Sequence, residues 1–537
     1  MSAGSIEKIQ NNDREGRFFN FRPCLFTALF LCLGIVFSDF ALGYGVSVWW
    51  AAVVLILPFV FYFVLRKKLA LFAGVALALA FLIGVFSYGL KAADFTDTKF
   101  YNSYDSKAYG RIVKMTDNGE TTLLVLDGVN IDGKTEKGKL IAYLPAASCE
   151  NIRLSDWVFV YGRVLTKTEL YGKNATYKEY FADDVRFYAN GRGISLSGHT
   201  FDLFSAAREL LKERLYTGMN ADVAPVAFAI LTGDTSGIDD GLLDNVRRGG
   251  IAHIFAVSGL HIGSLYGVGL FLFSKIEKLK NRKALKISLM SALLVLYGGL
   301  CGYSESVLRA VITCLVAYSS NLIGVKKDSL ESLSLAVIIL LLVNPVSLFC
   351  IGFQLSFASC YGIALLSKPL QTAFERGYRY VTKRTEEYPV SYARGTRGGI
   401  FSFLSVTVSA QVSTAPILLN AFGYLSIWSL LLNGIFVPCV GVLFSLTMGF
   451  GALVCLLPSV LCEILLFLPN LIWTIFLLAF EVGSFSVAFE NVTIGFLGFV
   501  CYATTLIILY DKLNLKKRDK ILFSALLFIA FLVAVLF

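Results

Sequence analysis

The chain has 537 residues, of which 56% are hydrophobic and only 16% are charged. Soluble domains carry about 25% charged residues, so this balance excludes an ordinary soluble protein and indicates lipid as the main solvent. The net charge of +10 fits a nucleic-acid binder or a membrane protein with basic loops on one side. The eleven cysteines form no CxxC pair, and the sequence has no phosphate loop, GxSxG elbow or HExxH motif. We therefore expect no metal site, no cofactor and no catalytic residue.

Residues 1–90 are expected to contain a polar tail and three membrane helices. The apolar runs at 24–43, 46–65 and 69–90 are each close to the roughly 20 residues that cross a bilayer. The tail lacks the cleavage site of a signal peptide, so the first run is expected to remain as an anchor.

Residues 91–197 are polar and contain short alternating runs at 122–126, 140–144 and 157–164. Turn signals such as Asp-Gly separate these runs, and alternation broken by turns predicts a small β-barrel or sandwich. The stretch SDWVFVYGR, at 155–163, resembles one strand of OB folds. The segment is therefore predicted to be an OB-like β domain.

Residues 198–250 are expected to form interfacial helices. Phe201–Leu215 is amphipathic, and two short helices are predicted at 221–231 and 240–248. Apolar helices then follow near 251–275, 286–301, 303–324, 330–343, 350–367, 399–420, 425–449, 452–482, 489–511 and 519–537. With the first three runs they predict an α-helical polytopic membrane protein with about 11 to 13 membrane helices. We separate a channel-like core, 251–449, from C-terminal helices, 450–537.

Charge placement predicts the orientation of the chain. Basic residues gather in the N-terminal tail, at 66–68, at 275–286, at 326–327, at 368–397 and at 512–520. All these segments fall on one side if the chain starts in the cytoplasm, as the positive-inside rule requires. The polar β domain is then extracytoplasmic, and the protein is expected in the plasma membrane.

The densest group of polar residues follows Asp234 and includes the stretch GGIAHIFAVSGLHIG at 249–263. On a continuous helix, Ser258 and His261 share a face, and His253 lies about 80° from His261. A polar helix face is costly in lipid, so it should look into protein or a water-filled path. Pore lining, substrate contact and a Ser/His pair are the functional interpretations, and helix packing through the glycines is the structural one.

The start of the helix predicted at 303–324 also carries polar residues. Glu305 and Arg309 stand at i and i+4 and could pair on one helix. Interfacial anchoring and a charge facing a cavity are equally consistent with this pair. The candidate substrate path comprises Asp234, His253, Ser258, His261, Glu305, Arg309, Gln354, Gln411 and Asn433.

Gln354 follows the helix-breaking Asn344-Pro345, Gln411 precedes Pro416, and Asn433 precedes Pro438. Each feature alone is explained by helix packing. Together they give several helices polar or broken centres, which is expected of a transport path and not of a simple anchor.

These blocks resemble the ComEC family of competence proteins in content and order over roughly residues 220–445. AHIFAVSGLHIG, at 252–263, looks like the hallmark of that family. The resemblance implies a plasma-membrane channel that imports single-stranded DNA during natural transformation, with an outer domain that handles incoming DNA. Single-stranded DNA and membrane lipid are the implied partners.

Longer members of the family end in a metallo-β-lactamase-like domain, whereas this sequence ends at Phe537 in an apolar run. We therefore expect no nuclease and no enzyme activity on this chain. A separate DNA receptor, a cytoplasmic motor and a separate nuclease are expected as partners, and oligomeric state is open. The alternatives are a small-solute transporter of another class and, least favoured, an intramembrane hydrolase using Ser258 and His261.

The candidate DNA-binding residues of the outer domain are Arg111, Lys114, Lys139, Trp157, Tyr161 and Arg163. A single-strand binder needs basic groups and aromatic rings that stack on bases. Trp157, Phe159, Tyr161 and Arg163 alternate along one strand face, as a stacking ladder would. Core packing is slightly favoured over binding, because an inward-facing strand row has the same pattern.

Overall fold

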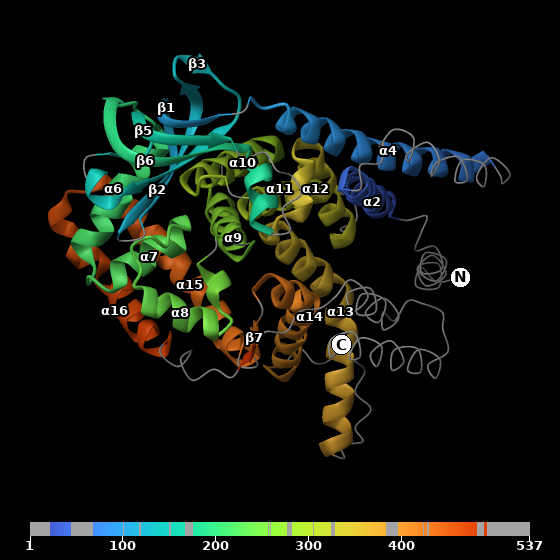
Figure 1. The fold of residues 1–537 in the computed structure, drawn as a ribbon. Helices are drawn as coiled ribbons and strands as arrows, with labels where there is room; N and C mark the ends of the chain where they lie inside the picture. Colours follow the sequence, from blue (N-terminus) through green and yellow to red (C-terminus); the bar gives the residue numbers. More distant parts are fainter. Residues whose placement is uncertain are drawn as a thin grey trace.

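The computed structural model describes residues 22–43, 68–99, 101–117, 120–149, 152–166, 175–255, 257, 259–276, 282–303, 305–323, 328–382, 396–422, 424–426, 429–480 and 488–490. The helices predicted at 46–65 and 519–537, and all but the start of 489–511, lie outside these residues. The described part is a helical body that carries a β-barrel between its α4 and α6 helices (Figure 1).

The barrel has five main strands: β1 (Asn102–Asp117), β2 (Thr121–Ile131), β4 (Lys139–Pro145), β5 (Trp157–Thr166) and β6 (Val185–Gly198). The strand order is β1-β5-β6-β4-β2, and pairing of β1 with β2 closes the barrel. β4 and β6 run parallel, whereas the other neighbours are antiparallel. A two-residue β3 (Lys134–Thr135) pairs with the end of β2. This closed five-stranded arrangement confirms the predicted OB-like domain.

Alternation in the sequence decides which side chains fill the barrel. Along β5, Val158, Val160 and Val164 are buried in the core, and the residues between them face outward. At the predicted Asp-Gly turn after β2, Asp132 and Gly133 both have positive φ angles, of 50° and 84°. Turns with positive φ angles match the twist of a β-hairpin. The turn residues and the alternation of buried residues therefore both favour the observed strands.

The N-terminal helix pair consists of α2 (Pro23–Gly43) and α4 (Lys68–Thr96), which run parallel to each other, and both helices agree with predicted spans. Their backbones cross at glycine. A Cβ on Gly34 would lie 2.1 Å from the Phe81 carbonyl oxygen, and one on Gly84 would lie 2.3 Å from the Leu31 oxygen. Small residues allow this close approach, which is typical of helix pairs in membranes.

The barrel is anchored to the helical body by α5 (Ala175–Ala182), which lies between β5 and β6 in the chain and shares a hydrophobic core with α2 and α4. Lys178 of α5 contacts the Asp39 carboxylate and the Tyr88 hydroxyl. Asn344 Nδ2 donates to the Ala182 carbonyl (3.0 Å) and Asn344 Oδ1 accepts from Lys91 (2.8 Å). The Asn-Pro block predicted to mark a broken helix therefore also holds the barrel.

The predicted interfacial helices are α6 (Leu203–Gly218), α7 (Val223–Thr232) and α8 (Asp240–Arg248). Asp202 caps α6 by accepting from the Ser205 backbone N–H (2.8 Å). Leu211 and Leu215 are buried, and the opposite face of α6 is charged. The prediction of an amphipathic helix is thus confirmed.

The other helices are α9 (Gly259–Lys275), α10 (Lys283–Leu300), α11 (Glu305–Ile323), α12 (Ser329–Val343), α13 (Ile351–Thr382), α14 (Thr396–Phe422), α15 (Ser429–Leu456) and α16 (Cys462–Phe480). Short elements between them are η2 (Ala252–Ile254), η4 (Pro345–Phe349), β7 (Tyr424–Ser426), η6 (Ser459–Leu461) and β8 (Ala488–Glu490). The continuous helix predicted at 251–275 is wrong, because the chain makes the 3-10 turn η2 before α9 begins. Likewise β7 precedes α15, and α13 continues well beyond residue 367.

Two large hydrophobic cores hold the helical body together. The first contains buried residues of α6, α7, α9, α10, α15 and α16. The second contains residues of α2, α4, α12 and α13 together with α5 and η4. Helix α11 belongs to both, since Val307 and Ala310 pack in the first core and Leu308 and Ile312 pack against the second. We call the contact between the cores at α11 the seam; it is lined by Gly259, Arg309, Phe357 and Cys360.

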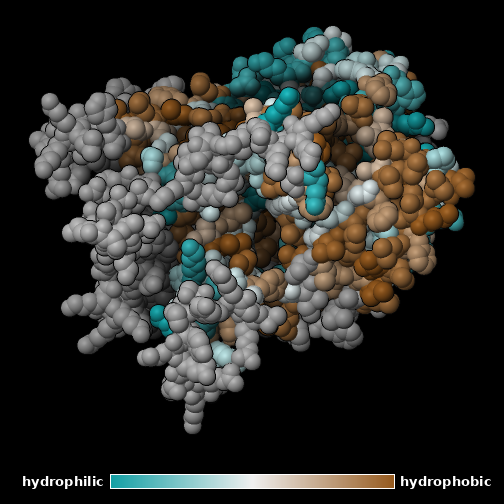
Figure 2. All heavy atoms as spheres, turned by 180° about the vertical axis from the view of Figure 1, so that it is seen from behind, coloured by the Kyte–Doolittle hydropathy of each residue, from teal (hydrophilic) through white to brown (hydrophobic). Residues whose placement is uncertain are grey.

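Five described helical segments are long and apolar enough to cross a membrane: Pro23–Gly43, Gly74–Thr96, Gly399–Phe422, Cys439–Leu456 and Ser459–Leu478. Exposed apolar residues gather on α16, among them Ile464, Phe467, Leu471, Ile475 and Leu478. Figure 2 shows this hydrophobic flank below the hydrophilic barrel. Exposing so large an apolar surface to water would be unfavourable. The helical body is therefore a polytopic membrane domain, and the barrel is a polar domain attached to it.

Candidate substrate path and outer face

The seam contains a buried cation. Arg309 is only 6% exposed, although it lies on an apolar helix. Its Nη1 lies 3.9 Å from Cys360 Sγ, and its guanidinium carbon lies 5.6 Å from the centre of the Phe357 ring. Nη2 lies 3.8 Å from the position that a Cβ of Gly259 would take. Arg309 therefore meets the first residue of α9, and of the two interpretations of its block, this geometry favours a charge facing the interior.

A second polar contact joins α14 and α15 beside the loop that precedes α9. Gln411 Nε2 donates to Ser429 Oγ (2.9 Å), and the Ser429 hydroxyl donates to the Ser426 carbonyl (2.7 Å). Gly250 packs against both serines: a Cβ there would lie 2.6 Å from Ser429 Cβ. Gln411 is thus brought beside the loop that leads to α9.

Asn433 lies further along α15 and is 8% exposed. Its Oδ1, and the Oγ atoms of Ser413 and Ser426, are buried with no hydrogen-bond partner in the part of the chain that the structure describes. Buried polar atoms in proteins are normally paired, so these three mark α14, α15 and the strand β7 between them as unusual for elements that only pack.

The two histidines of the hallmark segment lie in different elements. His261 is buried in α9, with its ring centroid 4.8 Å from that of Phe444 in an edge-on arrangement. His253 lies in η2 and is exposed. The expectation that both share one helix face is wrong, because the helix is broken between them. Ser258, and the side chain of Glu305, lie outside the described residues.

Two predicted path residues have local structural partners elsewhere. Asp234 pairs with Arg208 of α6 (3.1 Å) and accepts hydrogen bonds from the backbone N–H and hydroxyl of Ser236. Gln354 Nε2 donates to the Leu348 carbonyl (3.0 Å), which closes the turn of η4. Neither contact brings these side chains to the seam. Both contacts stabilise connections between helices.

The outer face of the barrel carries an aromatic and cationic row on β1 and β5, which we call the aromatic face. It consists of Tyr104, Lys107, Tyr109, Arg111, Trp157, Phe159, Tyr161 and Arg163. Cross-strand register places Lys107 opposite Tyr161, Tyr109 opposite Phe159, and Arg111 opposite Trp157. The inward core row considered for this ladder is therefore wrong, because the valines of β5 fill the core instead.

Side chains of the aromatic face stack on one another. The Tyr109 and Trp157 rings lie 5.0 Å apart at 18°, and Lys107 Nζ lies 3.8 Å above the Phe159 ring. The Arg163 guanidinium covers the Tyr104 ring at 4.3 Å. Rings and cations held in this way are suited to stack on bases and to meet phosphates.

Only some of the DNA-binding residues predicted for the outer domain lie together on the aromatic face. Arg111, Trp157, Tyr161 and Arg163 lie on the aromatic face, whereas Lys139 lies on β4, which pairs with neither β1 nor β5. Lys114 is exposed on β1 where that strand pairs with β2. Phe159, which belongs to the predicted ladder, lies on the aromatic face too, whereas Tyr109 and Lys107 are members that the prediction did not include. Their signal was present as alternation in KAYGR at 107–111, in step with β5.

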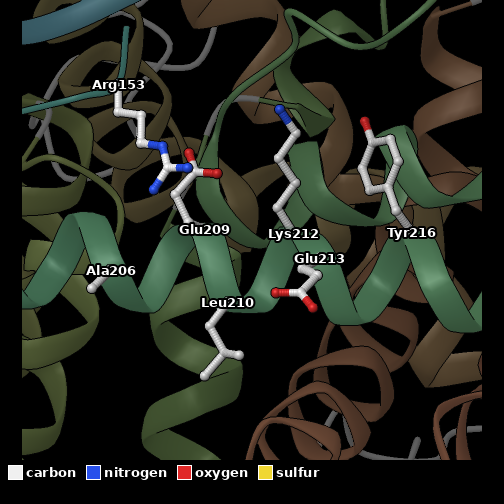
Figure 3. Close-up of a pocket in the computed structure, with 7 residues that line it drawn as sticks. All are labelled: Arg153, Ala206, Glu209, Leu210, Lys212, Glu213 and Tyr216. Carbon is white, nitrogen blue, oxygen red and sulfur yellow. The ribbon is translucent and has the colours of Figure 1, made fainter. Parts of the chain in front are cut away.

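An open pocket of about 590 Å³ lies between the barrel and α6. Its lining mixes both charges, with Arg153 and Lys212 against Glu209 and Glu213 (Figure 3). The Arg153 and Glu209 side chains point toward one another across it. Because its two cations and two carboxylates balance, this pocket offers a polyanion no net attraction, so the aromatic face is the better candidate for a nucleic acid.

Fold and site together define a class: a polytopic membrane protein whose helical body brings polar residues to the contact between two apolar cores, with a β-barrel attached. Residues 230–516, more than half of the chain, match the family model described as Competence protein. The chain belongs to this family, which confirms the resemblance to ComEC-type proteins. The matched region contains the seam and begins after the barrel.

Two curated relatives have similar sequences. ComE operon protein 3 of Bacillus subtilis (strain 168) is 29% identical over 243 residues, which cover 43% of this chain and 28% of that protein. Uncharacterized protein MG316 of Mycoplasma genitalium is 29% identical over 128 residues, covering 24% and 32%. The alignments thus span about a third of the length of these relatives. No solved structure matches the chain significantly.

Proposed function

We propose that this protein is a membrane channel that imports single-stranded DNA across the plasma membrane during natural transformation. The observation that carries the proposal is the seam, where Arg309 is buried between two apolar cores within the region that matches the Competence protein family. Intramembrane charges that lack a structural partner usually serve a transported substrate. The name of the similar Bacillus subtilis protein, ComE operon protein 3, agrees with a role in competence.

In this proposal the aromatic face receives the strand before it enters the helical body. Base stacking tolerates any sequence, which an uptake system requires. The barrel is extracytoplasmic and the N-terminus cytoplasmic, as the basic loops of the sequence predict. A separate receptor, a cytoplasmic motor and a separate nuclease would complete the pathway.

The decisive experiment compares uptake of labelled DNA and transformation frequency in a deletion strain and in the same strain complemented with the wild-type chain. We expect both quantities to fall strongly on deletion and to recover with the wild-type chain. H261A and R309A, each checked for normal membrane level, should then lower uptake. Undiminished uptake in the deletion strain would refute the proposal outright.

A small-solute transporter remains the second candidate, because buried polar atoms on α14 and α15 would also suit a solute. Thermal stabilisation of the purified protein by small solutes, with no effect of oligonucleotides, would favour it. A hydrolase using Ser258 and His261 predicts labelling by a fluorophosphonate, and absence of labelling would remove its motivation.

A further inference from the structure

The first turn of α9 lies beside open space at the seam. Among the described residues, no atom lies within 4 Å of the position that a Cβ of Gly263 would take, and only Arg309 comes that close to the Cβ position of Gly259. Gly263 is one turn beyond Gly259, so the two glycines share a face. That face therefore offers room at the helix start, next to the guanidinium.

The Arg309 guanidinium has no anionic partner among the described side chains. It has five N–H donors, and of these side chains it meets a sulfur atom and an aromatic ring. A buried cation is costly unless an anion or hydrogen-bond acceptors compensate for its lost hydration. Lipid cannot supply that compensation, so the space beside it must admit water or an anion.

The start of α9 adds a second source of positive potential. The first four backbone N–H groups of a helix have no partner within it, and aligned peptide dipoles make this end positive. α9 has 17 residues, and Nη2 of Arg309 approaches its first residue. Guanidinium and helix start converge on one space, the combination that holds phosphate groups in many proteins.

We propose that Arg309 and the first turn of α9 form an anion site for a phosphodiester group of the translocating strand. The proposal rests on the proposed function, since it takes the strand to be DNA. The Phe357 ring packs on the guanidinium, with its centre 5.6 Å from the guanidinium carbon. One cationic contact without base-specific donors would allow a strand of any sequence to pass.

The test introduces a thiol by G263C into the full chain, held in lipid nanodiscs with Cys360 replaced by alanine. Its reaction with a sulfonate-bearing methanethiosulfonate is compared with its reaction with the trimethylammonium analogue, by mass spectrometry of that position. G352C is the matched control, because its Cβ position is equally open but lies on α13. The rate ratio at G352C corrects for the intrinsic difference between the reagents.

We expect the anionic reagent to be favoured about tenfold at G263C relative to G352C, the size of one unit charge nearby in a partly polar interior. R309Q should abolish this preference and R309K should retain part of it. A preference that survives R309Q would overturn the proposal. So would a preference that appears only with E305Q, since Glu305 would then neutralise Arg309.

A protection arm identifies the source of the phosphate. Short oligo(dT) should slow modification at G263C and not at G352C, whereas inorganic phosphate at equal phosphate concentration should protect much less. Equal protection by inorganic phosphate would contradict a strand as the ligand. If the thiol results are as expected but deletion leaves DNA uptake unchanged, the proposed function fails and the anion site stands. If deletion abolishes uptake and the preference is absent, the site alone fails.

Discussion

The barrel and the helical body distribute their polar residues in opposite ways. In the barrel, valines fill the core and the candidate binding residues, such as Trp157 and Tyr161, lie outside. In the helical body, large apolar residues of α16 face outward, and Arg309, Gln411 and Asn433 are buried or partly buried. Each region turns its apolar residues toward its own nonpolar surroundings, a protein core in one case and lipid in the other.

This difference determines what a substitution should do in each region. A change on the aromatic face removes a ligand contact from a scaffold that folds without it. A change in the helical body removes a polar group that is packed between neighbouring helices. Such a change should therefore lower function and stability together. The following predictions test this contrast, from the largest effect to the smallest.

The strongest effect is expected where the two regions meet. Arg186 of β6 is buried; its Nη1 donates to the Asp94 carbonyl (2.8 Å) and the Thr98 hydroxyl (3.1 Å), and its Nε pairs with Asp184 (2.8 Å). R186Q should destabilise the protein by about 3 kcal/mol, because it removes several charge-assisted hydrogen bonds of a buried guanidinium, including those to the Asp94 carbonyl and to Asp184. The measurement is thermal unfolding of the purified protein in nanodiscs.

The matched control for this prediction is R192Q. Arg192 is also on β6, but its pair with Asp105 is exposed, with side chains 71% and 88% accessible. Exposed pairs contribute little, so the melting temperature should hardly change. Equal destabilisation by both variants would show that the buried contact does not join barrel and body.

The next effect concerns close packing in the helical body. Gly250 has φ +71° and its Cβ position lies 2.6 Å from Ser429 Cβ. G250A should cost about 2 kcal/mol, since an L-residue is strained at this angle and also meets Ser429. The double variant G250A/S429G should recover only the part caused by the collision, as measured by thermal unfolding.

G263A is the control for the glycine prediction, because no atom of the described residues lies within 4 Å of that Cβ position. Within a helix, alanine is favoured over glycine by about 0.5–1 kcal/mol, so this variant should be neutral or slightly more stable. A stable G250A protein would mean that the loop before α9 is not packed on α15 as described.

On the aromatic face the effect should fall on binding and not on stability. Tyr161 is 41% exposed, and Phe159 lies beside it on the same strand face. The double variant F159A/Y161A should weaken binding of oligo(dT) to the full chain by about tenfold or more, because each stacking contact is lost. Fluorescence anisotropy measures the affinity, and unfolding should remain close to wild type.

Y143A is the control for the aromatic face. Tyr143 is 38% exposed on β4, away from β1 and β5. Its removal should leave the affinity unchanged. Equal weakening by Y143A would mean that the barrel binds DNA through general charge and surface area, and not through the row on β1 and β5.

Sequence reasoning was most successful where one periodicity determines the structure. Alternation located β2, β4 and β5, and apolar length located α2, α4 and α12, because these signals are local. It could not place Trp157 inside or outside, since both faces of β5 are apolar or aromatic. Only the closure of β1 on β5 decides that question.

Prediction of the site had the same limit. Arg309 and Gln411 were recognised as polar residues in apolar runs, but their partners Gly259 and Ser429 are distant in sequence. The helix expected through His253 and His261 failed because the Gly250 turn and η2 satisfy backbone groups locally. Nothing in the sequence indicated that Asn344 would hold α5, since that contact depends on where the barrel docks.

The smallest effect is expected at Asp202, where the barrel passes into α6. Its carboxylate accepts from the Ser205 hydroxyl and backbone N–H, and these bonds lower the pKa of Asp202. A carboxyl group with a lowered folded pKa stabilises the protein above its unfolded value, near pH 4, and loses this contribution as pH falls through the folded pKa. D202A should therefore cost about 1 kcal/mol at pH 7 and progressively less in acid. D202N, which keeps an acceptor but no titrating group, should cost less at pH 7, and its melting temperature should converge with wild type as the pH falls. A cost of D202A that stayed constant down to pH 3 would show that the cap is not the source of the effect.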